Sequence, residues 1–151
     1  MIKQLQNNDL NVSEKIMKLF LSSYAIEAKL LKAINFPPLK RPIEKYINTN
    51  TTFYGYFENE ILCGAIEINY NNLRTHINSL VVDPQHFRKG IASSLLKFTL
   101  ESFESNLFMV ETGVDNDPAS QLYRKFDFVV VKQWDTDHGV RKVRFEKKIK
   151  I

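Results

Sequence analysis

The residues best suited to chemistry in this sequence lie in a short basic loop that leads into a helix. Arg88 and Lys89 precede Gly90-Ile91-Ala92, which opens a long amphipathic segment. Gly90 and Ala92 carry little or no side chain, so a ligand can approach the backbone closely. The first amides of a helix lack intrahelical partners, and the helix dipole favours negative charge there. The loop is therefore predicted to bind a pyrophosphate group.

The elements around this loop must hold it in place. An apolar strand is predicted at 75–82 and ends at Asp83-Pro84. After the loop, apolar residues recur at helical spacing as far as Phe103, which predicts a helix with a buried stripe. A further strand is predicted at 107–112. Asn116 then stands before Asp117-Pro118, a strong signal for the start of a second helix.

The rest of the chain supplies more strands and helices but no repeat, low-complexity segment or linker. A short first strand is expected at 2–5, helical stretches at 13–23 and 26–34, a proline-containing loop at 36–39, a short helix at 43–47, a hairpin of strands at 52–57 and 61–70, and final strands at 128–134 and 140–149. This mixture predicts an α/β (mixed α+β) class: one twisted sheet with helices on both faces. Residues 1–151 are expected to form a single domain.

Two segments of the sequence resemble motifs of the GNAT superfamily of N-acetyltransferases. The segment V-V-D-P-x-x-x-R-K-G-I-A-x-x-L-L resembles the acetyl-CoA-binding motif Q/R-x-x-G-x-G/A, with Phe87 at the position of Gln or Arg. A later segment resembles N-x-x-A-x-x-L-Y-x-x-x-G-F, with Asp127 in place of Gly; its matching positions are Asn116, Ala119, Leu122, Tyr123 and Phe128. The motifs stand in the family's order and spacing, and the resemblance covers about residues 50–147.

The resemblance implies a central sheet that is mixed but mostly antiparallel, in which two strands splay apart to seat the cofactor. Acetyl-CoA is the implied cosubstrate, and no metal is expected. Backbone groups near Leu80, Val81 and Val82 would pair with pantetheine, and the amides from Arg88 to Ala92 would hold the pyrophosphate. Asn116 would contact the cofactor, cap the second helix, or do both.

The same resemblance implies the groups that move protons during acetyl transfer. Tyr123 is the candidate general acid, which would protonate the leaving thiolate; the alternative is a core tyrosine with a structural hydrogen bond. Glu111 ranks first as the general base, with His76 and Glu67 behind it and a water relay as a further option. A glutamate base would need burial to raise its pKa.

The acceptor is expected to be a primary amine on a small molecule or peptide, bound between the N-terminal helices and the C-terminal hairpin. Glu27 and Glu44 are candidates to attract the cationic amine. The predicted apolar wall consists of Tyr24, Phe36, Pro37, Pro38 and Leu39. The acceptor's identity is left open. So is the oligomeric state, although homodimers are common among proteins that resemble this one.

The composition of the chain limits its partners and its setting. The chain has 151 residues, 44% of them hydrophobic, and a formal net charge of +4. This charge favours an acidic partner such as a polyanionic cofactor. The single cysteine, Cys63, excludes a disulfide framework and suits a cytoplasmic setting. Nucleic acid and membrane are not expected partners. Two rival functions remain: a non-catalytic acyl-CoA-binding or regulatory module on the same fold, and a basic nucleic-acid-binding module.

Overall fold

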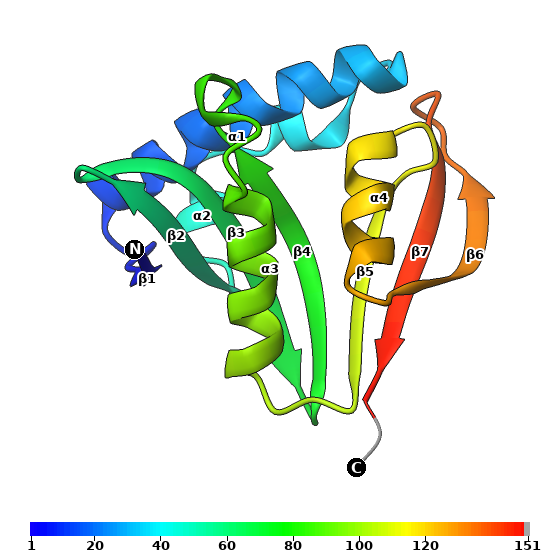
Figure 1. Cartoon of the computed structure of the whole chain (residues 1–151). Coiled ribbons are helices and arrows are strands. Elements are labelled where there is room, and N and C mark those ends of the chain that lie inside the picture. The colour runs from blue at the N-terminus through cyan, green and yellow to red at the C-terminus, as the bar shows by residue number, and fades with distance from the viewer. Residues whose placement is uncertain (150–151) are drawn as a thin grey trace.

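A seven-stranded sheet forms the centre of the protein. The structure is a computed structural model that describes residues 1–149. The strands lie in the order β1-β2-β3-β4-β5-β7-β6 (Figure 1). Only β4 and β5 pair in parallel; all other neighbours are antiparallel. The strands are β1 (Ile2–Leu5), β2 (Thr52–Glu58), β3 (Ile61–Asn71), β4 (Arg74–Val82), β5 (Leu107–Gly113), β6 (Val129–Asp135) and β7 (Arg141–Lys148).

Helices cover both faces of this sheet. One face carries α3 (Ile91–Ser102) and α4 (Asp117–Lys125), and the other carries α1 (Leu10–Leu31), the 3-10 turn η1 (Pro37–Lys40) and α2 (Glu44–Ile47) (Figure 1). Alternate residues of the strands serve the two faces: Ala65 packs with α1, and the next residue, Ile66, packs with α3. The predicted mixed fold with helices on both faces is confirmed.

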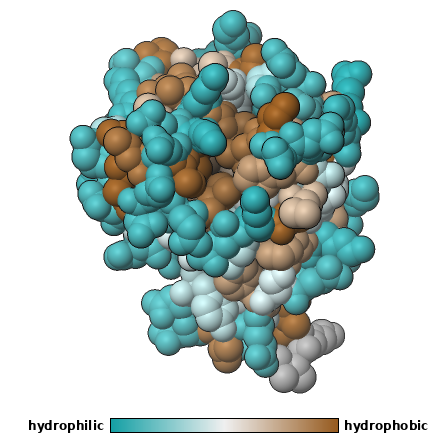
Figure 2. All heavy atoms as spheres, turned by 90° about the vertical axis from the view of Figure 1, so that its left-hand side faces the viewer, coloured by the Kyte–Doolittle hydropathy of each residue, from teal (hydrophilic) through white to brown (hydrophobic). Residues whose placement is uncertain are grey.

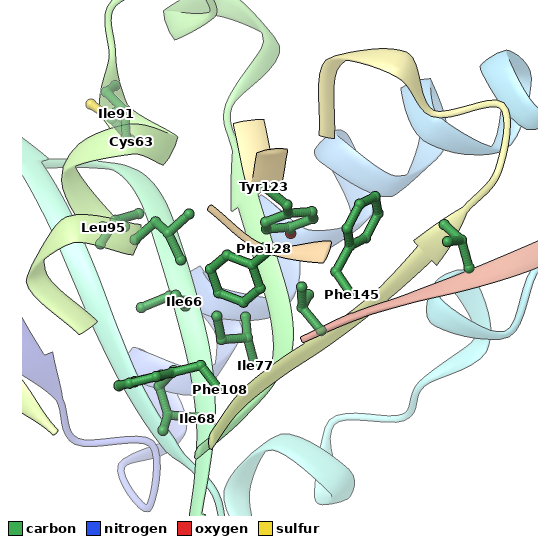
Figure 3. Close-up of a cluster of buried hydrophobic side chains, with 13 residues drawn as sticks. Cys63, Ile66, Ile68, Ile77, Ile91, Leu95, Phe108, Tyr123, Phe128 and Phe145 are labelled. Atoms are coloured by element: carbon green, nitrogen blue, oxygen red, sulfur yellow. The ribbon is translucent and has the colours of Figure 1, made fainter. Parts of the chain in front are cut away.

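Each face has its own apolar core. The core on the α3 and α4 side includes Leu95, Ile77, Phe108 and Phe145 (Figure 3). The core on the α1 side centres on Phe20, which packs edge-on against Tyr46 and Phe53. Strand β4 contributes to both cores, through Ile77 on one face and Val81 on the other, whereas Phe108 and Val110 of β5 belong to the core on the α3 and α4 side.

The two parallel strands separate along their length. Their register pairs run only from Arg74 with Leu107 to Ile77 with Val110. Directly after Ile77, the pairing of β3 with β4 shifts, so that Asn78 has no partner on β3. An extra residue of this kind bends a strand and increases its twist. The predicted splayed strand pair is confirmed, and the bend lies where the separation begins.

The N-terminal helical region differs from the prediction in two ways. The two predicted helices are one continuous helix, α1, which Asp9 caps by accepting hydrogen bonds from the amides of Asn11 and Val12. It ends at Lys32 in a left-handed conformation. No glycine or proline interrupts Ser22 to Glu27, so nothing in the chain breaks the helix there. The predicted proline loop contains the short turn η1, since proline suits the first position of a helical turn.

The surface on the side of the β1–β2 edge is mixed in character. Hydrophilic atoms cover much of it, and hydrophobic atoms reach the surface between them, mainly in the upper half of the view (Figure 2). Scattered exposed hydrophobic groups are normal on protein surfaces. Within residues 1–149, no helix combines the length and the apolar character needed to cross a membrane.

Candidate active site

A large cavity fills the space where β4 and β5 separate. Its volume is about 530 Å³, and it reaches from the start of α3 to α4 and the side of α1. Three groups of residues line it: the end of β4 with the loop to α3, the end of β5 with the start of α4, and one side of α1. Predicted site residues among them are Leu80, Val82, Arg88, Gly90, Ile91, Ala92, Glu111, Asn116 and Tyr123.

One end of the cavity is the open N-terminus of α3. Gly90 caps this helix at a φ of 74° and makes no side-chain cap hydrogen bond. A Cβ atom added at Gly90 would meet no atom within 4 Å. Arg88 and Ser93 also line this part of the cavity. The first amides of α3 therefore face free space at the positive end of the helix dipole, which is the geometry of a phosphate site.

Two residues predicted to contact the cofactor do not line the cavity. Lys89 lies 3.6 Å from the carboxylate of Glu58, outside the lining. The side chain of Val81 packs into the α1-side core, because it points to the opposite face from Leu80 and Val82. Phe87, which replaces the motif's first residue, lines the cavity with 44% of its surface exposed.

The backbone of β4 past Ile77 has a strand partner on one side only. From Leu80 to Val82 it pairs with β3, and no register pair joins it to β5. Backbone groups of a strand alternate in direction, so part of this stretch presents donors and acceptors to the cavity. The arrangement offers an extended polar ligand the hydrogen bonds that another strand would make.

Tyr123, on α4, also lines the cavity. Only 4% of its surface is exposed, and its ring packs beside Phe128 and Phe145 at centroid distances of 5.7 and 5.6 Å (Figure 3). Its hydroxyl makes no hydrogen bond with any group in residues 1–149. Burial raises the pKa of this phenol, and Tyr24 and Glu27 raise it further. The group therefore holds its proton at neutral pH and directs it into a cavity.

Asn116 connects the start of α4 to α1. Its Oδ1 accepts a hydrogen bond from the amide of Ala119 at 3.3 Å, which caps the helix. Its Nδ2 donates to Glu27 Oε1 at 2.9 Å and to Thr112 Oγ1 at 3.2 Å. Asn116 is thus a capping residue that also lines the cavity, and it holds a carboxylate in place there.

Among the titratable residues that line the cavity, Glu27 has a pKa shifted toward neutral pH. Burial raises its pKa from 4.5 to about 7, against the opposing effects of nearby Lys142 and of the hydrogen bond from Asn116. A carboxylate with this pKa exchanges protons efficiently near neutral pH. From the sequence, Glu27 is expected only to attract the acceptor amine. No local signal shows that α1 places it beside residue 116.

The three candidate bases from the sequence lie in different settings. Glu111 lines the cavity, with 29% of its side chain exposed and Arg144 at 3.8 Å. His76 lies outside the lining, and burial lowers its pKa. Glu67 is 2% exposed and binds Arg41 through two contacts of 2.8 and 3.0 Å. The structure therefore brings only Glu111 of the three to the cavity.

A second, smaller cavity of about 170 Å³ lies between α1, η1 and the start of β7. It shares Tyr24, Glu27, Asn78, Ser79, Glu111 and Thr112 with the large cavity, so the two meet in the gap between β4 and β5. Of the predicted acceptor residues, Tyr24, Glu27, Phe36 and Pro38 line this cavity. Pro37, Leu39 and Glu44 do not, because η1 and α2 turn them away from it.

Other features of the site agree with its motifs. Asp127 adopts a φ of 68°, the left-handed conformation expected where the family motif has glycine. In the part of the chain that the structure describes, no cluster of three or more His, Cys, Asp or Glu side chains is arranged to hold a metal ion.

The sequence matches a known protein family. The family model described as an acetyltransferase (GNAT) domain matches residues 21–149. The match therefore starts within α1, well before the first of the two sequence motifs. It extends almost to the end of the chain.

Two curated relatives share part of the sequence. The UPF0157 protein YqkA of Bacillus subtilis (strain 168) is 30% identical over 129 residues, which cover 85% of this chain and 38% of that protein. A streptothricin acetyltransferase of Escherichia coli is 37% identical over 82 residues, which cover 51% of this chain and 47% of that protein. The chain thus spans less than half the length of either relative.

Solved structures share the fold over nearly the full length. The PaiA N-acetyltransferase from Thermoplasma acidophilum, in complex with coenzyme A, has a TM-score of 0.77 at 21% identity and covers 99% of this chain and 98% of its own. The ribosomal-protein-S18-alanine N-acetyltransferase from Escherichia coli has a TM-score of 0.79 at 14% identity, with coverages of 100% and 94%. At these identities the likeness shows a common fold.

Proposed function

Because the chain belongs to the GNAT acetyltransferase family, we propose that it transfers an acetyl group from acetyl-CoA to a primary amine by direct attack in a ternary complex. The observation that carries the proposal is the separation of β4 from β5 after Ile77 and Val110. The resulting cavity of about 530 Å³ is lined by residues at the N-terminus of α3, where no side chain caps the helix, and by the buried Tyr123. This suits a long cofactor with a pyrophosphate and a thioester.

The cofactor would lie along β4. Its pyrophosphate would accept hydrogen bonds from the first amides of α3, with Arg88 alongside, and its pantetheine arm would pair with the unpartnered backbone of Leu80 to Val82. The solved neighbour in complex with coenzyme A supports this choice of cofactor. The thioester would then reach the part of the cavity shared with the smaller one.

The reaction has a simple balance of bonds and protons. The amine nitrogen attacks the thioester carbonyl, a carbon–nitrogen bond forms, and the carbon–sulfur bond breaks. The nitrogen loses one proton to a base, and the thiolate of coenzyme A takes one from an acid. We assign the acid to Tyr123, because its side chain lines the cavity and its hydroxyl makes no hydrogen bond within residues 1–149.

We assign the base to Glu27, ahead of Glu111. Both carboxylates line the two cavities where they meet. The pKa of Glu27 is raised to about 7, which places its proton exchange near neutral pH, whereas Glu111 faces Arg144 at 3.8 Å. Direct transfer also agrees with the position of Cys63: this thiol is buried outside the cavity lining, and burial raises its pKa.

The proposal extends to the setting of the protein. We treat residues 1–151 as one acetyltransferase domain that works on a small-molecule or peptide amine. The named activity of a streptothricin acetyltransferase relative supports an amine acceptor. A reducing, cytoplasmic environment suits the single free cysteine.

Thermal unfolding with and without acetyl-CoA tests the cofactor, with NAD and a short DNA duplex as controls. Acetyl-CoA at about a hundred times its dissociation constant should add about 2.7 kcal/mol to the free energy of unfolding. Release of free thiol from acetyl-CoA in the presence of an amine panel then tests turnover. Stabilisation by acetyl-CoA without thiol release from any amine would favour the non-catalytic acyl-CoA-binding module. Stabilisation by DNA alone would favour the nucleic-acid-binding module.

A further inference from the structure

The charged side chains that line the smaller cavity differ in whether they have ionic partners within the protein. Four charged side chains line it: Glu27, Arg41, Glu111 and Lys142. Their formal charges cancel, so the cavity as a whole is not an acidic pocket. The chemistry that it can recognise depends on which of these four charges are already matched by neighbours in the protein.

Two of the four charges are matched. Arg41 binds both carboxylate oxygens of Glu67, at 2.8 and 3.0 Å, and its guanidinium also lies 4.2 Å from the centroid of the Tyr46 ring. Glu111 has Arg144 at 3.8 Å, a guanidinium that it shares with Glu146 at 3.0 Å. These contacts engage both charges within the protein and weaken the field that each presents to a ligand.

The other two charges face the cavity without an ionic partner. The carboxylate of Glu27 accepts a hydrogen bond from the neutral amide of Asn116, and no cation lies within 4 Å of it in residues 1–149. Over the same described part of the chain, Lys142 forms no ion pair either. Lys142 is close enough to Glu27 to lower its pKa, although the two do not touch. A separated carboxylate and ammonium thus line one small space.

We propose that the acceptor is a small zwitterion of amino-acid size, whose ammonium group binds at Glu27 and whose carboxylate binds at Lys142. This inference rests on the proposed acetyltransferase function and names its substrate class. Each charge of the ligand meets the opposite charge on the protein. A polyamine would place positive charge near Lys142, at a cost in binding energy.

The size of the cavity supports the same class of molecule. Its volume of about 170 Å³ is close to that of an engineered protein cavity of about 150 Å³ that binds benzene. Apolar contacts are available from Phe36, Pro38 and Val140, so a short hydrocarbon side chain can be covered while the charged groups are held. The amine held at Glu27 lies where the two cavities meet, next to the expected thioester.

The reaction on such a ligand adds one proton transfer to the balance given above. The ammonium nitrogen first gives one proton to Glu27, which passes it to solvent, and the neutral amine then attacks the thioester carbonyl. As the carbon–sulfur bond breaks, the thiolate of coenzyme A takes the proton of Tyr123, and the second proton lost by the nitrogen restores the tyrosine through solvent. The products are the N-acetylated acid and coenzyme A. The carboxylate takes no part in bond changes and serves only to orient the amine.

The test compares matched acceptors in the thiol-release assay. Each amino acid of a panel is paired with its carboxamide and with the amine that lacks the carboxyl group. For the best amino acid, we expect kcat/KM to exceed that of its carboxamide and that of its decarboxylated amine by about tenfold or more. Lys142→Met should raise the KM for that amino acid by about tenfold. Its effect on kcat/KM for the decarboxylated amine should be much smaller when both acceptors are compared well above the pKa of Glu27, where the loss of the lysine no longer changes the ionisation of that base. Lys148→Met, at an exposed position of the same strand, is the control.

Two results would overturn the inference while leaving the proposed function intact. One is equal kcat/KM for an amino acid and its decarboxylated amine. The other is an equal effect of Lys142→Met on both acceptors, which would indicate a structural role for the lysine. If acetyl-CoA neither stabilises the protein nor releases thiol with any amine, the proposed function itself fails and this inference fails with it. Thermal unfolding of each variant separates loss of binding from loss of folding.

Discussion

Asn116 Nδ2 lies 2.9 Å from Glu27 Oε1, although the two residues are 89 positions apart in the chain. This hydrogen bond joins the cap of α4 to α1 across the open end of the sheet. It also fixes a carboxylate, with a pKa raised to about 7, at the point where the two cavities meet.

The first prediction concerns the pH dependence of the rate. A base must be deprotonated to act, so kcat/KM should rise with pH and level off above about pH 7, the pKa of Glu27. Glu27→Gln should lower kcat by about 10² to 10⁴ and remove this step, since glutamine cannot take a proton. Steady-state kinetics from pH 5.5 to 9 measure both effects.

Glu14→Gln serves as the matched control, because Glu14 lies on the same helix with an exposed side chain. Its pH profile should be that of the parent protein. If Glu27→Gln keeps the step near pH 7 and Glu111→Gln loses it, the base is Glu111.

The second prediction concerns stability. The pKa of Glu27 is about 7 in the folded protein against 4.5 for the ordinary group. Between these values the folded protein holds a proton that the unfolded chain has released. The free energy of unfolding therefore falls as the pH rises from 4.5 to about 7. Glu27→Gln should remove this loss and be more stable at pH 8 by up to about 3 kcal/mol.

Urea denaturation at pH 5 and pH 8 measures this effect in the parent protein, Glu27→Gln and Glu14→Gln. The quantity of interest is the change in free energy of unfolding between the two pH values. An identical change in all three proteins would mean that Glu27 titrates normally.

The third prediction concerns Tyr123. Tyr123→Phe removes the hydroxyl and keeps the ring that packs beside Phe128 and Phe145. We expect kcat to fall by about 10² or more, with little change in the affinity for acetyl-CoA. Thiol release and calorimetric titration of acetyl-CoA measure the two quantities separately.

Tyr46→Phe is the matched control for Tyr123→Phe. Tyr46 is fully buried, and its hydroxyl has no hydrogen-bond partner in the described chain. Removing that hydroxyl should leave kcat unchanged. An unchanged rate in Tyr123→Phe would show that the leaving thiolate takes its proton from another source, or from solvent.

The fourth prediction concerns the phosphate end of the cavity. Gly90 has a φ of 74°, a conformation that costs about 1 to 2 kcal/mol for other residues, and an added Cβ would project into open space within the lining. Gly90→Ala should weaken acetyl-CoA binding by about tenfold, because it disturbs the amides that face the pyrophosphate.

Gly139→Ala controls for backbone strain alone. Gly139 has a φ of 79° in the turn between β6 and β7 and does not line the large cavity. Both variants should lose similar stability, but only Gly90→Ala should lose affinity in calorimetric titration. Equal affinities would place the pyrophosphate elsewhere.

The fifth prediction separates a structural carboxylate from a catalytic one. Glu67 is almost fully buried and receives hydrogen bonds from Arg41, Thr51 and Ser79. Glu67→Gln leaves the Arg41 charge without a partner and should reduce the free energy of unfolding by about 3 to 5 kcal/mol. The pH step in the rate of the folded fraction should persist.

Glu101→Gln, at an exposed position of α3, is the control and should be close to neutral in denaturation. Loss of the pH step in Glu67→Gln, with stability retained, would instead identify Glu67 as the base.

The sequence predicted those parts of the site that depend on local patterns. The strand, loop and helix around Gly90 and the cap at Asn116 rest on glycine, proline and helical spacing within a few residues. The same is true of the left-handed residue Asp127. Such features are set by nearby backbone chemistry, so they can be identified before the tertiary contacts are known.

The parts that escaped prediction depend on contacts between distant residues. The region before residue 50 offered no readable chemistry, yet α1 carries Glu27 into the cavity. From its place on a strand, Glu67 is a candidate base. In the structure, Arg41, which lies 26 positions away in the chain, binds its carboxylate. Arg88 and Lys89 are adjacent and equally basic, but the conformation of the loop sends Lys89 toward Glu58.

The short ladder between β4 and β5 also divides the sheet into two halves that are joined at one end. Strands β1 to β4 form one half and β5 to β7 the other. The ladder that joins their backbones runs from Arg74 to Ile77 and is extended by one hydrogen bond from the Asn106 amide to the Leu73 oxygen. A body of this shape bends most easily at its joint. A ligand that contacts both halves reduces their motion relative to each other. Hydrogen exchange of amides should therefore slow across the whole sheet, and not only at the cavity, when the cavity is filled.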